Sequence, residues 1–163
     1  MGAGKTTIGR ALAKRLNLEF IDSDREIEAR TGVSIPTVFE IEGEDGFRKR
    51  EALVIDDLSR SGGRVVATGG GVVLRQDNRE RLMASGFVVY LNVPPHTLWE
   101  RTRHDKNRPL LQVDNPLLKL KELYAQRNPL YLEVANMVID GSRVHAQSIV
   151  NILVKEVGER WKH

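Results

Sequence analysis

The sequence predicts one three-layer α/β/α domain with a parallel sheet, spanning residues 1–163. Short apolar runs alternate with helical patterns along the whole chain, as in domains whose helices cover both faces of a sheet. The first helical pattern follows Gly2-Ala3-Gly4-Lys5-Thr6-Thr7, the end of the phosphate-binding pattern G-x-x-x-x-G-K-[S/T]. Two apolar runs end in Asp22–Asp24 and Gly69–Gly71, and the carboxyl ends of strands are where such sheets bind ligands.

The composition excludes several classes of function. The charge is nearly balanced, with 25 basic and 22 acidic residues, which argues against a nucleic-acid partner. A pI near 9.3 suits small anionic substrates. Cysteine is absent, which excludes disulfides and thiolate catalysis and agrees with a cytoplasmic location. No apolar run approaches the roughly 18 residues that span a membrane, so we expect no membrane partner.

The phosphate loop predicts an ATP site with magnesium. Small residues let backbone N–H groups approach phosphates, and the positive end of the following helix faces their charge. Lys5 is expected to reach the β- and γ-phosphates, and the Thr6 hydroxyl is expected to ligate Mg²⁺. The expected nucleotide-binding residues are Gly2, Ala3, Gly4, Lys5, Thr6 and Thr7.

The first glycine of the pattern, and the strand that feeds it, fall before Met1. We therefore expect the native product to begin roughly ten residues earlier, enough for one strand and the first turn of the loop. A chain that starts at Met1 is expected to be unstable or inactive, because neighbouring strands would lose their partner. Met1-Gly2 with Thr6 also fits an N-myristoylation pattern, although no polybasic patch supports a membrane anchor.

The first half of the chain predicts one strand and then a helical block. A strand over residues 18–22 precedes a helix over 25–30, which Gly32 ends. A second helical piece begins at Ser34 and is broken by Gly43 and Gly46. A third covers residues 47–59, with Leu53, Val54 and Leu58 pointing inward. Residues 23–60 are thus expected to form a helical substrate-binding part.

The second half alternates strands and helices. The apolar run at residues 87–93 predicts a strand buried on both faces of a parallel sheet. The polar, proline-broken residues 104–116 predict a mobile loop. The other expected elements are strands at 64–68 and 137–139 and helices at 77–85, 97–103, 117–127 and 144–160.

Two aspartates and three glycines follow the predicted strands. Asp22 suits Mg²⁺, through water, and Asp24 suits the attacking hydroxyl as an orienter or a base. The simpler alternative is that both only cap the next helix. Gly69–Gly71 lets a ligand approach the backbone without a Cβ in the way, but three glycines also suit an ordinary flexible turn.

Three arginines are candidates for binding an anion. Arg48 begins a helical piece, Arg108 lies in the proline-broken loop, and Arg127 precedes Pro129 near an expected helix end. Arginine binds a carboxylate or a phosphate through two parallel hydrogen bonds, which lysine cannot reproduce. For each arginine alone, a solvated surface charge is the better explanation, and only joint recognition of one anion argues against it.

Taken together, these motifs resemble those of the shikimate kinases, in the nucleoside-monophosphate-kinase-like branch of P-loop proteins. The resemblance covers essentially the whole chain, and its pieces occur in the family's order. They are GAGKTT at 2–7, FIDSD at 20–24, GFRKRE at 46–51, ATGGG at 67–71, RPLL at 108–111 and RNPLY at 127–131. The resemblance implies a five-stranded parallel sheet, whose first strand is not in this sequence. It also implies ATP-dependent phosphorylation of the 3-hydroxyl of shikimate, on the route to chorismate and the aromatic amino acids.

The resemblance also implies roles for individual residues. Lys5, Asp24 and Arg108 form the catalytic group, and Arg108 lies on a lid at about 104–116 that also contacts ATP. Thr6 and Asp22 serve Mg²⁺. Shikimate is held by Asp24, by a backbone contact from Gly70, and by Arg48 and Arg127 on its carboxylate. The resemblance further implies that Arg101 or Arg143 lies against adenine and that Phe39 and Phe47 wall the shikimate pocket.

Two other functions stay open from the sequence. The first is a kinase for another polyol acid, such as gluconate, although the paired arginines and the three glycines argue against it. The second is a non-catalytic module that binds a nucleotide or a partner protein. For the kinase we expect shikimate and ATP as ligands, Mg²⁺ as cofactor, and a cytoplasmic monomer.

Overall fold

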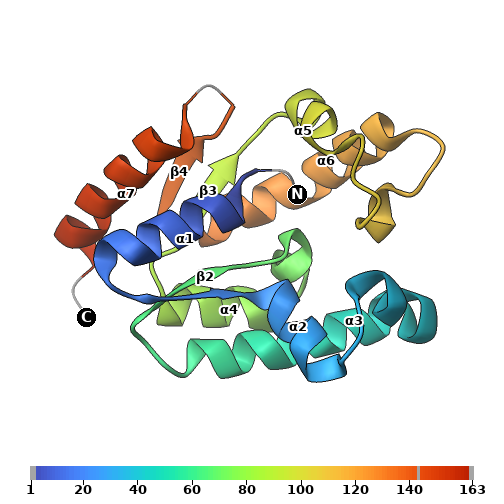
Figure 1. Ribbon diagram of the computed structural model, residues 1–163, viewed down its shortest axis with the longest axis horizontal. Helices are drawn as coiled ribbons and strands as arrows, with labels where there is room; N and C mark the ends of the chain where they lie inside the picture. Colours follow the sequence, from blue (N-terminus) through green and yellow to red (C-terminus); the bar gives the residue numbers. More distant parts are fainter. Residues whose placement is uncertain (1–2, 143, 162–163) are drawn as a thin grey trace.

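In the computed structural model, residues 3–142 and 144–161 are described, and they form a helix-rich α/β domain (Figure 1). The helices are α1 (Lys5–Leu16), α2 (Ser23–Thr31), α3 (Ile35–Ser59), α4 (Gln76–Ser85), α5 (Pro95–Thr102), α6 (Pro116–Val134) and α7 (Ala146–Arg160). The strands are β1 (Glu19–Asp22), β2 (Arg64–Ala67), β3 (Val89–Asn92) and β4 (Met137–Asp140). Two short 3₁₀ helices, η1 (Gly70–Leu74) and η2 (Pro109–Leu111), complete the described elements.

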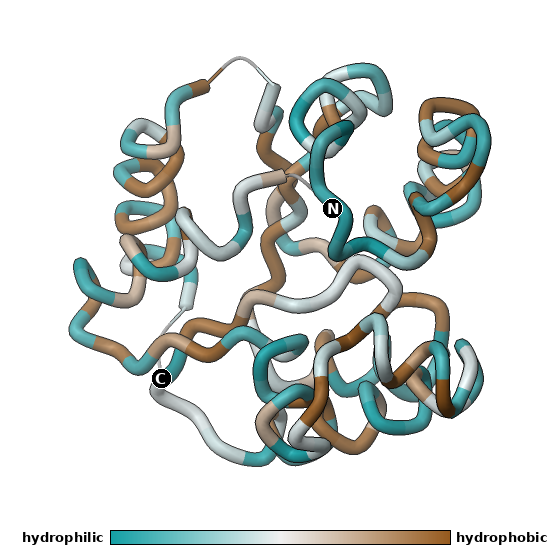
Figure 2. Tube along the Cα trace, turned by 45° about the vertical axis from the view of Figure 1, so that its right-hand side comes forward, coloured by the Kyte–Doolittle hydropathy of each residue, from teal (hydrophilic) through white to brown (hydrophobic). Residues whose placement is uncertain are grey.

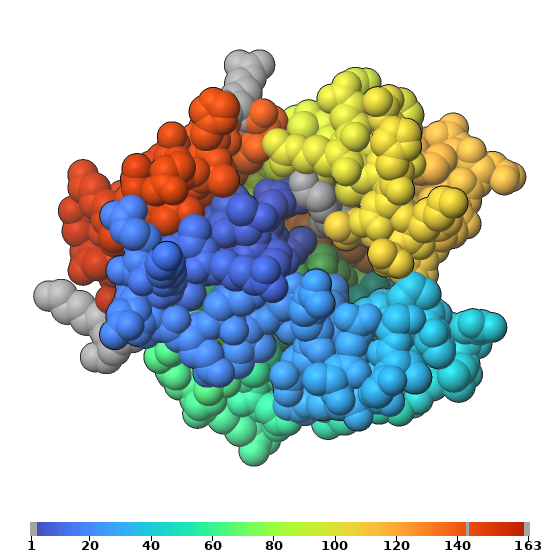
Figure 3. All heavy atoms as spheres, viewed as in Figure 1, coloured from blue at the N-terminus to red at the C-terminus, as the bar shows by residue number. Residues whose placement is uncertain are grey.

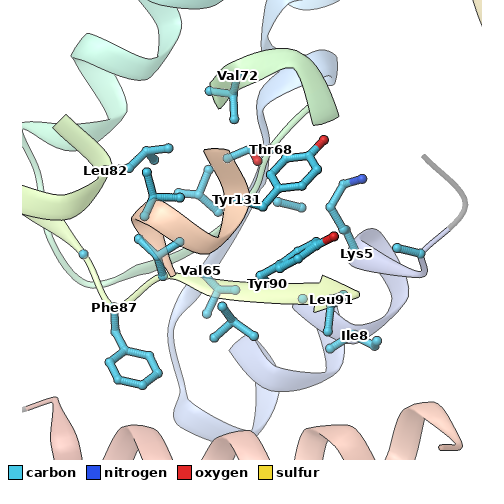
Figure 4. Close-up of a pocket in the computed structure, with 18 of the residues that line it drawn as sticks. Lys5, Ile8, Val65, Thr68, Val72, Leu82, Phe87, Tyr90, Leu91 and Tyr131 are labelled. Carbon is cyan, nitrogen blue, oxygen red and sulfur yellow. The ribbon is translucent and has the colours of Figure 1, made fainter. Parts of the chain in front are cut away.

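The strands are parallel, as predicted, but they form two pairs instead of one sheet. β1 pairs with β2, with Phe20 opposite Val65, and β3 pairs with β4, with Tyr90 opposite Val138. A cavity of about 400 Å³ lies between the pairs. Apolar side chains of β2 and β3 line it, with Leu82 and the Tyr90 and Tyr131 rings (Figure 4). The α/β class is therefore confirmed, and the division into two pairs agrees with the expectation that neighbouring strands lack a partner.

Helices cover both faces of the strand pairs and give the expected three layers. On one face, α1 and α7 pack Ile8, Leu12 and Leu153 against strand residues from both pairs. On the other face, α2 and α3 cover β1 and β2, while α4, α6 and η1 cover the start of β3. Apolar segments of the trace accordingly gather along the strands in the middle of the molecule (Figure 2).

Local capping fixes where the helices near the strand ends begin and stop. The Asp22 carboxylate accepts hydrogen bonds from the Asp24 and Arg25 amides, which makes it the N-cap of α2. Gly32 ends α2 with φ of 73°. Ser34 caps α3 by accepting from the Thr37 amide. The capping alternative for Asp22 is thus real, and it leaves the second oxygen of Asp22 available for other contacts.

α3 is continuous from Ile35 to Ser59 except for one break. Gly43 has φ of 71° and ψ of −179°, which kinks the helix there, whereas Gly46 lies inside it, so the predicted second break was wrong. The inward position of Leu53 was also wrong, since this side chain is 65% exposed. Val54 and Leu58 are buried as expected. Glu51, Val54 and Leu58 recur at helical spacing, which turns Leu53 to the opposite face.

α6 continues well past the predicted end at residue 127. Pro129 lies inside it, and the helix ends only at Val134. A proline in a helix interior costs about 3 kcal/mol, because it removes one hydrogen bond and crowds the preceding turn. Leu130, Tyr131 and Val134 pack into a core cluster with α3 and η1, which offsets that cost. The last turn of α6 is therefore held by tertiary packing that the local sequence does not reveal.

Two other segments differ from their predictions. Residues 87–93 form a strand only from Val89 to Asn92, and its residues are half-buried because the strand borders the cavity. In the loop at 104–116, η2 buries Leu111 against Leu120 and Leu123 of α6, so its middle is anchored. No helix within residues 3–142 and 144–161 has both the length and the apolar character to cross a bilayer.

Which face of α3 is buried can be tested with substitutions at two adjacent residues. Val54→Ala should lower the free energy of unfolding by about 2 kcal/mol, because it removes buried methyl groups and leaves a cavity. Leu53→Ala is the matched control and should change it by less than about 0.5 kcal/mol, as expected for an exposed side chain. Urea denaturation of both variants measures this, and equal losses would contradict the observed helix phase.

Candidate functional site

The phosphate-loop residues lead into α1 through a left-handed turn. Gly4 is the N-cap of α1 with φ of 85°, a conformation that glycine adopts without strain. Lys5 is the first residue of the helix, and its side chain borders the cavity (Figure 4). Burial lowers the pKa of Lys5, and nearby Arg108 lowers it further. Ala3 is half-buried and Thr7 is exposed, while Gly2 lies outside the described residues.

Thr6 and Asp22 meet although 16 residues separate them. The Thr6 hydroxyl donates to Asp22 Oδ2 at 3.0 Å, while Asp22 Oδ1 caps α2. This places a hydroxyl and a carboxylate together beside the N-terminus of α1. Hard oxygen ligands of this kind suit Mg²⁺, which binds few protein groups and keeps waters and phosphate oxygens for the rest. Within the described residues no group of three or more acidic, histidine or cysteine side chains could enclose a metal.

Asp24 faces both the phosphate loop and the arginines. Burial raises the pKa of its carboxyl, and the neighbouring Asp22 raises it further. The charges of Lys5, Arg48 and Arg108 act in the opposite direction. Asp24 Oδ1 is buried and has no hydrogen-bond partner among the described residues. A buried carboxylate oxygen without a partner is costly, so it marks a place where a ligand can donate a hydrogen bond.

The three glycines at 69–71, which we call the triglycine turn, let several elements approach closely. The Gly69 amide donates to the buried Ser23 hydroxyl at 3.1 Å. A Cβ at Gly69 would lie 2.8 Å from Asp24 Oδ1, and one at Gly71 would lie 2.1 Å from Arg48 Nη1. Both distances are too short for real contacts, so the turn is a close-approach site instead of merely a flexible one.

Arg48 lies between the triglycine turn and a buried acid. It donates to Glu51 at 3.1 Å and to the more exposed Glu44 at 3.2 Å. Its guanidinium also lies 5.1 Å from the Phe47 ring centroid, and Phe47 packs against Phe39 at 4.7 Å. The Arg48 Nε and Glu51 Oε2 atoms are buried without partners in the described part of the chain.

Arg127 brings a second guanidinium, from α6, to the same cluster. It is 4% exposed, which is unusual for an arginine, and its Nε has no partner among the described residues. Its charge acts on Glu51 and on Tyr131, which places all three in one neighbourhood. Tyr131, one turn further along α6, donates to the Gly70 carbonyl at 2.6 Å.

The segment after α5 approaches the same region. Arg108 donates to Asp105 at 2.9 Å, and its charge acts on both Lys5 and Asp24. The surface is hollowed between this segment and the α2–α3 region (Figure 3). Arg101 donates to the Gly141 carbonyl at 3.0 Å, and Arg143 lies outside the described residues. The candidate residues thus form one continuous neighbourhood that runs from Arg108 and Lys5 through Asp24 to Arg48 and Arg127.

Sequence reasoning did not single out Ser23, Glu51 or Tyr131. Two of them were within reach, because Glu51 follows Arg48 by three residues and Tyr131 follows Arg127 by four, spacings that share a helix face. Tyr131 was missed because α6 was expected to end before Pro129. Ser23 carried no signal, since a serine next to an aspartate at a helix start looks like a cap.

This arrangement suits transfer of a phosphoryl group to a small anionic alcohol. Phosphates fit the amides at the start of α1 beside Lys5, and an anion fits the two buried guanidinium groups. A carboxylate with a raised pKa, Asp24, lies between them, where an attacking hydroxyl would have to be.

Comparison with known proteins agrees with this assignment of a phosphoryl-transfer site. The family model described as shikimate kinase matches residues 1–158. The chain is 61% identical over 156 residues to a shikimate kinase of Dechloromonas aromatica, covering 96% of this chain and 85% of that protein. It is 57% identical over 157 residues to one of Aromatoleum aromaticum, covering 96% of this chain and 90% of that protein. The structure is also similar to that of a shikimate kinase from Acinetobacter baumannii in complex with shikimate, with TM-score 0.94 and 49% identity over 99% of this chain and 91% of that one.

Glu51 gives the site a measurable pH signature. Burial raises the pKa of its carboxyl to about 7, and Arg48 offsets only part of this shift. Because the folded pKa lies above the usual value of 4.5, folding favours the protonated acid, and this stabilisation is lost as the pH rises toward 7. The slope is at most about 1.4 kcal/mol per pH unit for one group.

Glu51→Gln should therefore flatten the fall in unfolding free energy between pH 4.5 and about pH 7. Some slope will remain, since the pKa of Asp24 is also raised. Glu44→Gln, in which the more exposed partner of Arg48 is changed, is the control and should keep the wild-type slope. Urea denaturation across this pH range measures the effect, and identical slopes for wild type and Glu51→Gln would refute the assignment.

Proposed function

This chain belongs to the shikimate kinase family, and we propose how its own residues transfer a phosphoryl group from ATP to shikimate. The acceptor in this proposal is the 3-hydroxyl, and the product, shikimate 3-phosphate, leads to chorismate and the aromatic amino acids. The observation that supports the proposal best is that Lys5, Asp24, Arg48 and Arg127 share one neighbourhood around the triglycine turn.

The carboxylate of shikimate binds to Arg48 and Arg127 in this proposal. These guanidinium groups come from α3 and α6, and both retain a buried Nε without a partner in the described chain. Two arginines on one carboxylate fix its direction as well as its position. Glu51 holds the Arg48 guanidinium from the other side and keeps it close to Gly71. The Gly70 amide adds a backbone contact to the same substrate.

The reacting hydroxyl then lies against Asp24. The raised pKa of this carboxyl makes it a stronger proton acceptor, which suits a group that orients the hydroxyl and takes its proton. Lys5 lies next to Asp24 and to the amides at the start of α1, so it can hold the phosphates close to the acceptor. Holding donor and acceptor together supplies much of the rate gain in phosphoryl transfer.

Positive charge near the transferred group comes from Lys5 and Arg108. Arg108 acts electrostatically on both Lys5 and Asp24, although it lies in the segment after α5. Thr6 and Asp22 are the residues that would hold Mg²⁺, since they bring two oxygen ligands within 3.0 Å of each other. The metal, when bound, neutralises charge on the β- and γ-phosphates.

The proposal extends to organisation and location. The helical residues 23–60 form the acceptor side, residues 104–116 form a lid over the nucleotide, and Ala3, Gly4 and Thr7 border the phosphates. Arg101 lies toward the adenine side, where its bond to the Gly141 carbonyl joins α5 to the loop after β4. We propose that the enzyme is a cytoplasmic monomer, and size-exclusion chromatography with light scattering tests the oligomeric state.

The proposed binding of the shikimate carboxylate by Arg48 can be tested by changing the arginine and by removing the charge of the carboxylate. Arg48→Lys should lower kcat/KM for shikimate about thirtyfold, since lysine keeps the charge but loses the paired hydrogen bonds. Shikimate methyl ester lacks the carboxylate charge, so the wild type should discriminate strongly against it and Arg48→Lys should discriminate much less. A coupled ADP-release assay measures both substrates, with gluconate as a third.

Arg60→Lys, at the exposed end of α3, is the matched control and should behave as wild type. Equal losses on shikimate and on the ester in Arg48→Lys would show that Arg48 does not bind the carboxylate. Turnover of gluconate in preference to shikimate would overturn the substrate assignment itself.

The metal assignment predicts a specific effect of Asp22→Asn. Asparagine is also a good N-cap, so α2 should keep its start and the protein its fold. The lost charge should raise the Mg²⁺ concentration for half-maximal rate at least about tenfold, in keeping with the loss of one carboxylate ligand. A magnesium titration at saturating ATP and shikimate measures this, and an unchanged midpoint would exclude Asp22 from the metal site.

A further inference from the structure

The triglycine turn is held by three elements at once. On its first residue, the Gly69 amide donates to Ser23, at the start of α2. On its second, the Gly70 carbonyl accepts from Tyr131 of α6. On its third, Gly71 lies against the Arg48 guanidinium from α3. The Gly70 amide opens the 3₁₀ turn η1 and so has no partner within that turn, which leaves it suited to a ligand.

Tyr131 is half-buried, and its hydroxyl lies near both the triglycine turn and Arg127. Its ring stacks on Tyr90 with centroids 4.8 Å apart and packs in the core cluster that contains Val72 and Val134. The hydroxyl points away from these apolar side chains toward η1 (Figure 4). Burial raises the pKa of the phenol, with the Arg127 charge partly opposing, so the group remains a hydrogen-bond donor at neutral pH.

Tyr131 also shares a helix face with the arginine proposed to bind the substrate carboxylate. It follows Arg127 by four residues on α6, and both residues lie near Glu51. The bond from Tyr131 to the Gly70 carbonyl therefore links the helix that carries Arg127 to the turn that carries the Gly70 amide. These two ligand-binding groups belong to segments that are 57 residues apart, and this hydrogen bond joins those segments directly.

We propose that Tyr131 is a positioning residue for the acceptor, which sets the distance between the Arg127 guanidinium and the Gly70 amide through its hydrogen bond to the triglycine turn. The proposal rests on the proposed function, because it concerns the binding of shikimate at the same site. It assigns Tyr131 no contact with the reacting atoms. Its loss should weaken binding of the acceptor and leave binding of ATP largely intact.

A purely structural role for this hydroxyl makes a different forecast. A half-buried phenol hydroxyl is better satisfied with an acceptor in any case, and the Gly70 carbonyl provides one. If the Tyr131 hydroxyl had only this structural role, removing it would lower stability without changing the KM for shikimate. The two roles can thus be separated by comparing kinetics with thermal unfolding.

Tyr131→Phe removes the hydroxyl alone, and Tyr124→Phe is its matched control. Tyr124 lies on the same helix and also borders the cavity, but its hydroxyl donates to Asn92 at 3.0 Å and does not reach the turn. Each variant loses a part-buried hydrogen bond, so both should melt somewhat below the wild type. We expect the KM for shikimate to rise at least about fivefold in Tyr131→Phe, the scale of one lost hydrogen bond.

In the same variant the KM for ATP should stay within about twofold of wild type, and Tyr124→Phe should leave both constants unchanged. A lower melting temperature in Tyr131→Phe with an unchanged KM for shikimate would overturn the positioning role. Equal rises of the KM for shikimate and of the KM for ATP in both Tyr131→Phe and Tyr124→Phe would also overturn it. A wild-type protein that folds and binds ATP but does not turn over shikimate would instead refute the proposed function, so the two failures are distinguishable.

Discussion

The site depends on how closely the backbone of the triglycine turn lets charged side chains approach. A Cβ at Gly71 would overlap the Arg48 guanidinium, and one at Gly69 would crowd the Asp24 carboxylate. No residue with a side chain fits either position without moving these groups. Arg48 and Asp24 come from different helices, α3 and α2, and both side chains reach this turn. Because Gly69 and Gly71 have no side chains, the Asp24 carboxylate and the Arg48 guanidinium can occupy the space beside the turn.

This packing brings an unusual amount of charge out of water. Glu51 and Arg127 are almost fully buried, and Arg48 and Asp24 are largely so. Paired charges in a protein interior roughly offset the free energy of removing them from water, so they add little to stability. Several of their polar atoms nevertheless lack partners in the described chain. The cluster is better explained by readiness for a polar ligand than by its effect on stability.

The sequence predicted features that depend on neighbouring residues, but it did not predict features that depend on packing between distant segments. The start of α1 at Lys5 and the cap at Asp22 follow from residues a few positions apart. The continuation of α6 through Pro129 and the burial of Glu51 depend on contacts between distant segments. The loss of pairing between neighbouring strands was expected from the incomplete phosphate-loop pattern, but which strands pair with which could not be predicted from apolar runs alone.

In the candidate site, too, some residues could be predicted from motifs and others only from the folded structure. The motifs identified the groups that act on phosphate and on carboxylate, because each carries a recognisable pattern of residue types. They did not identify Tyr131 or Ser23, whose only feature is the backbone group that each meets in the folded chain. Supporting residues of this kind become visible only when the segments that they join are seen together.

α1 connects the two strand pairs across the cavity between them. No backbone hydrogen bond joins β2 to β3 in the described residues, so the two halves of the domain meet along a seam of side chains. α1 bridges this seam, since Ile8 and Leu12 pack into one cluster with Val65 of β2 and Leu91 of β3. The same helix presents Lys5 and Thr6 at its N-terminus. The packing of α1 on both strand pairs therefore also sets the positions of these two residues relative to the strand ends.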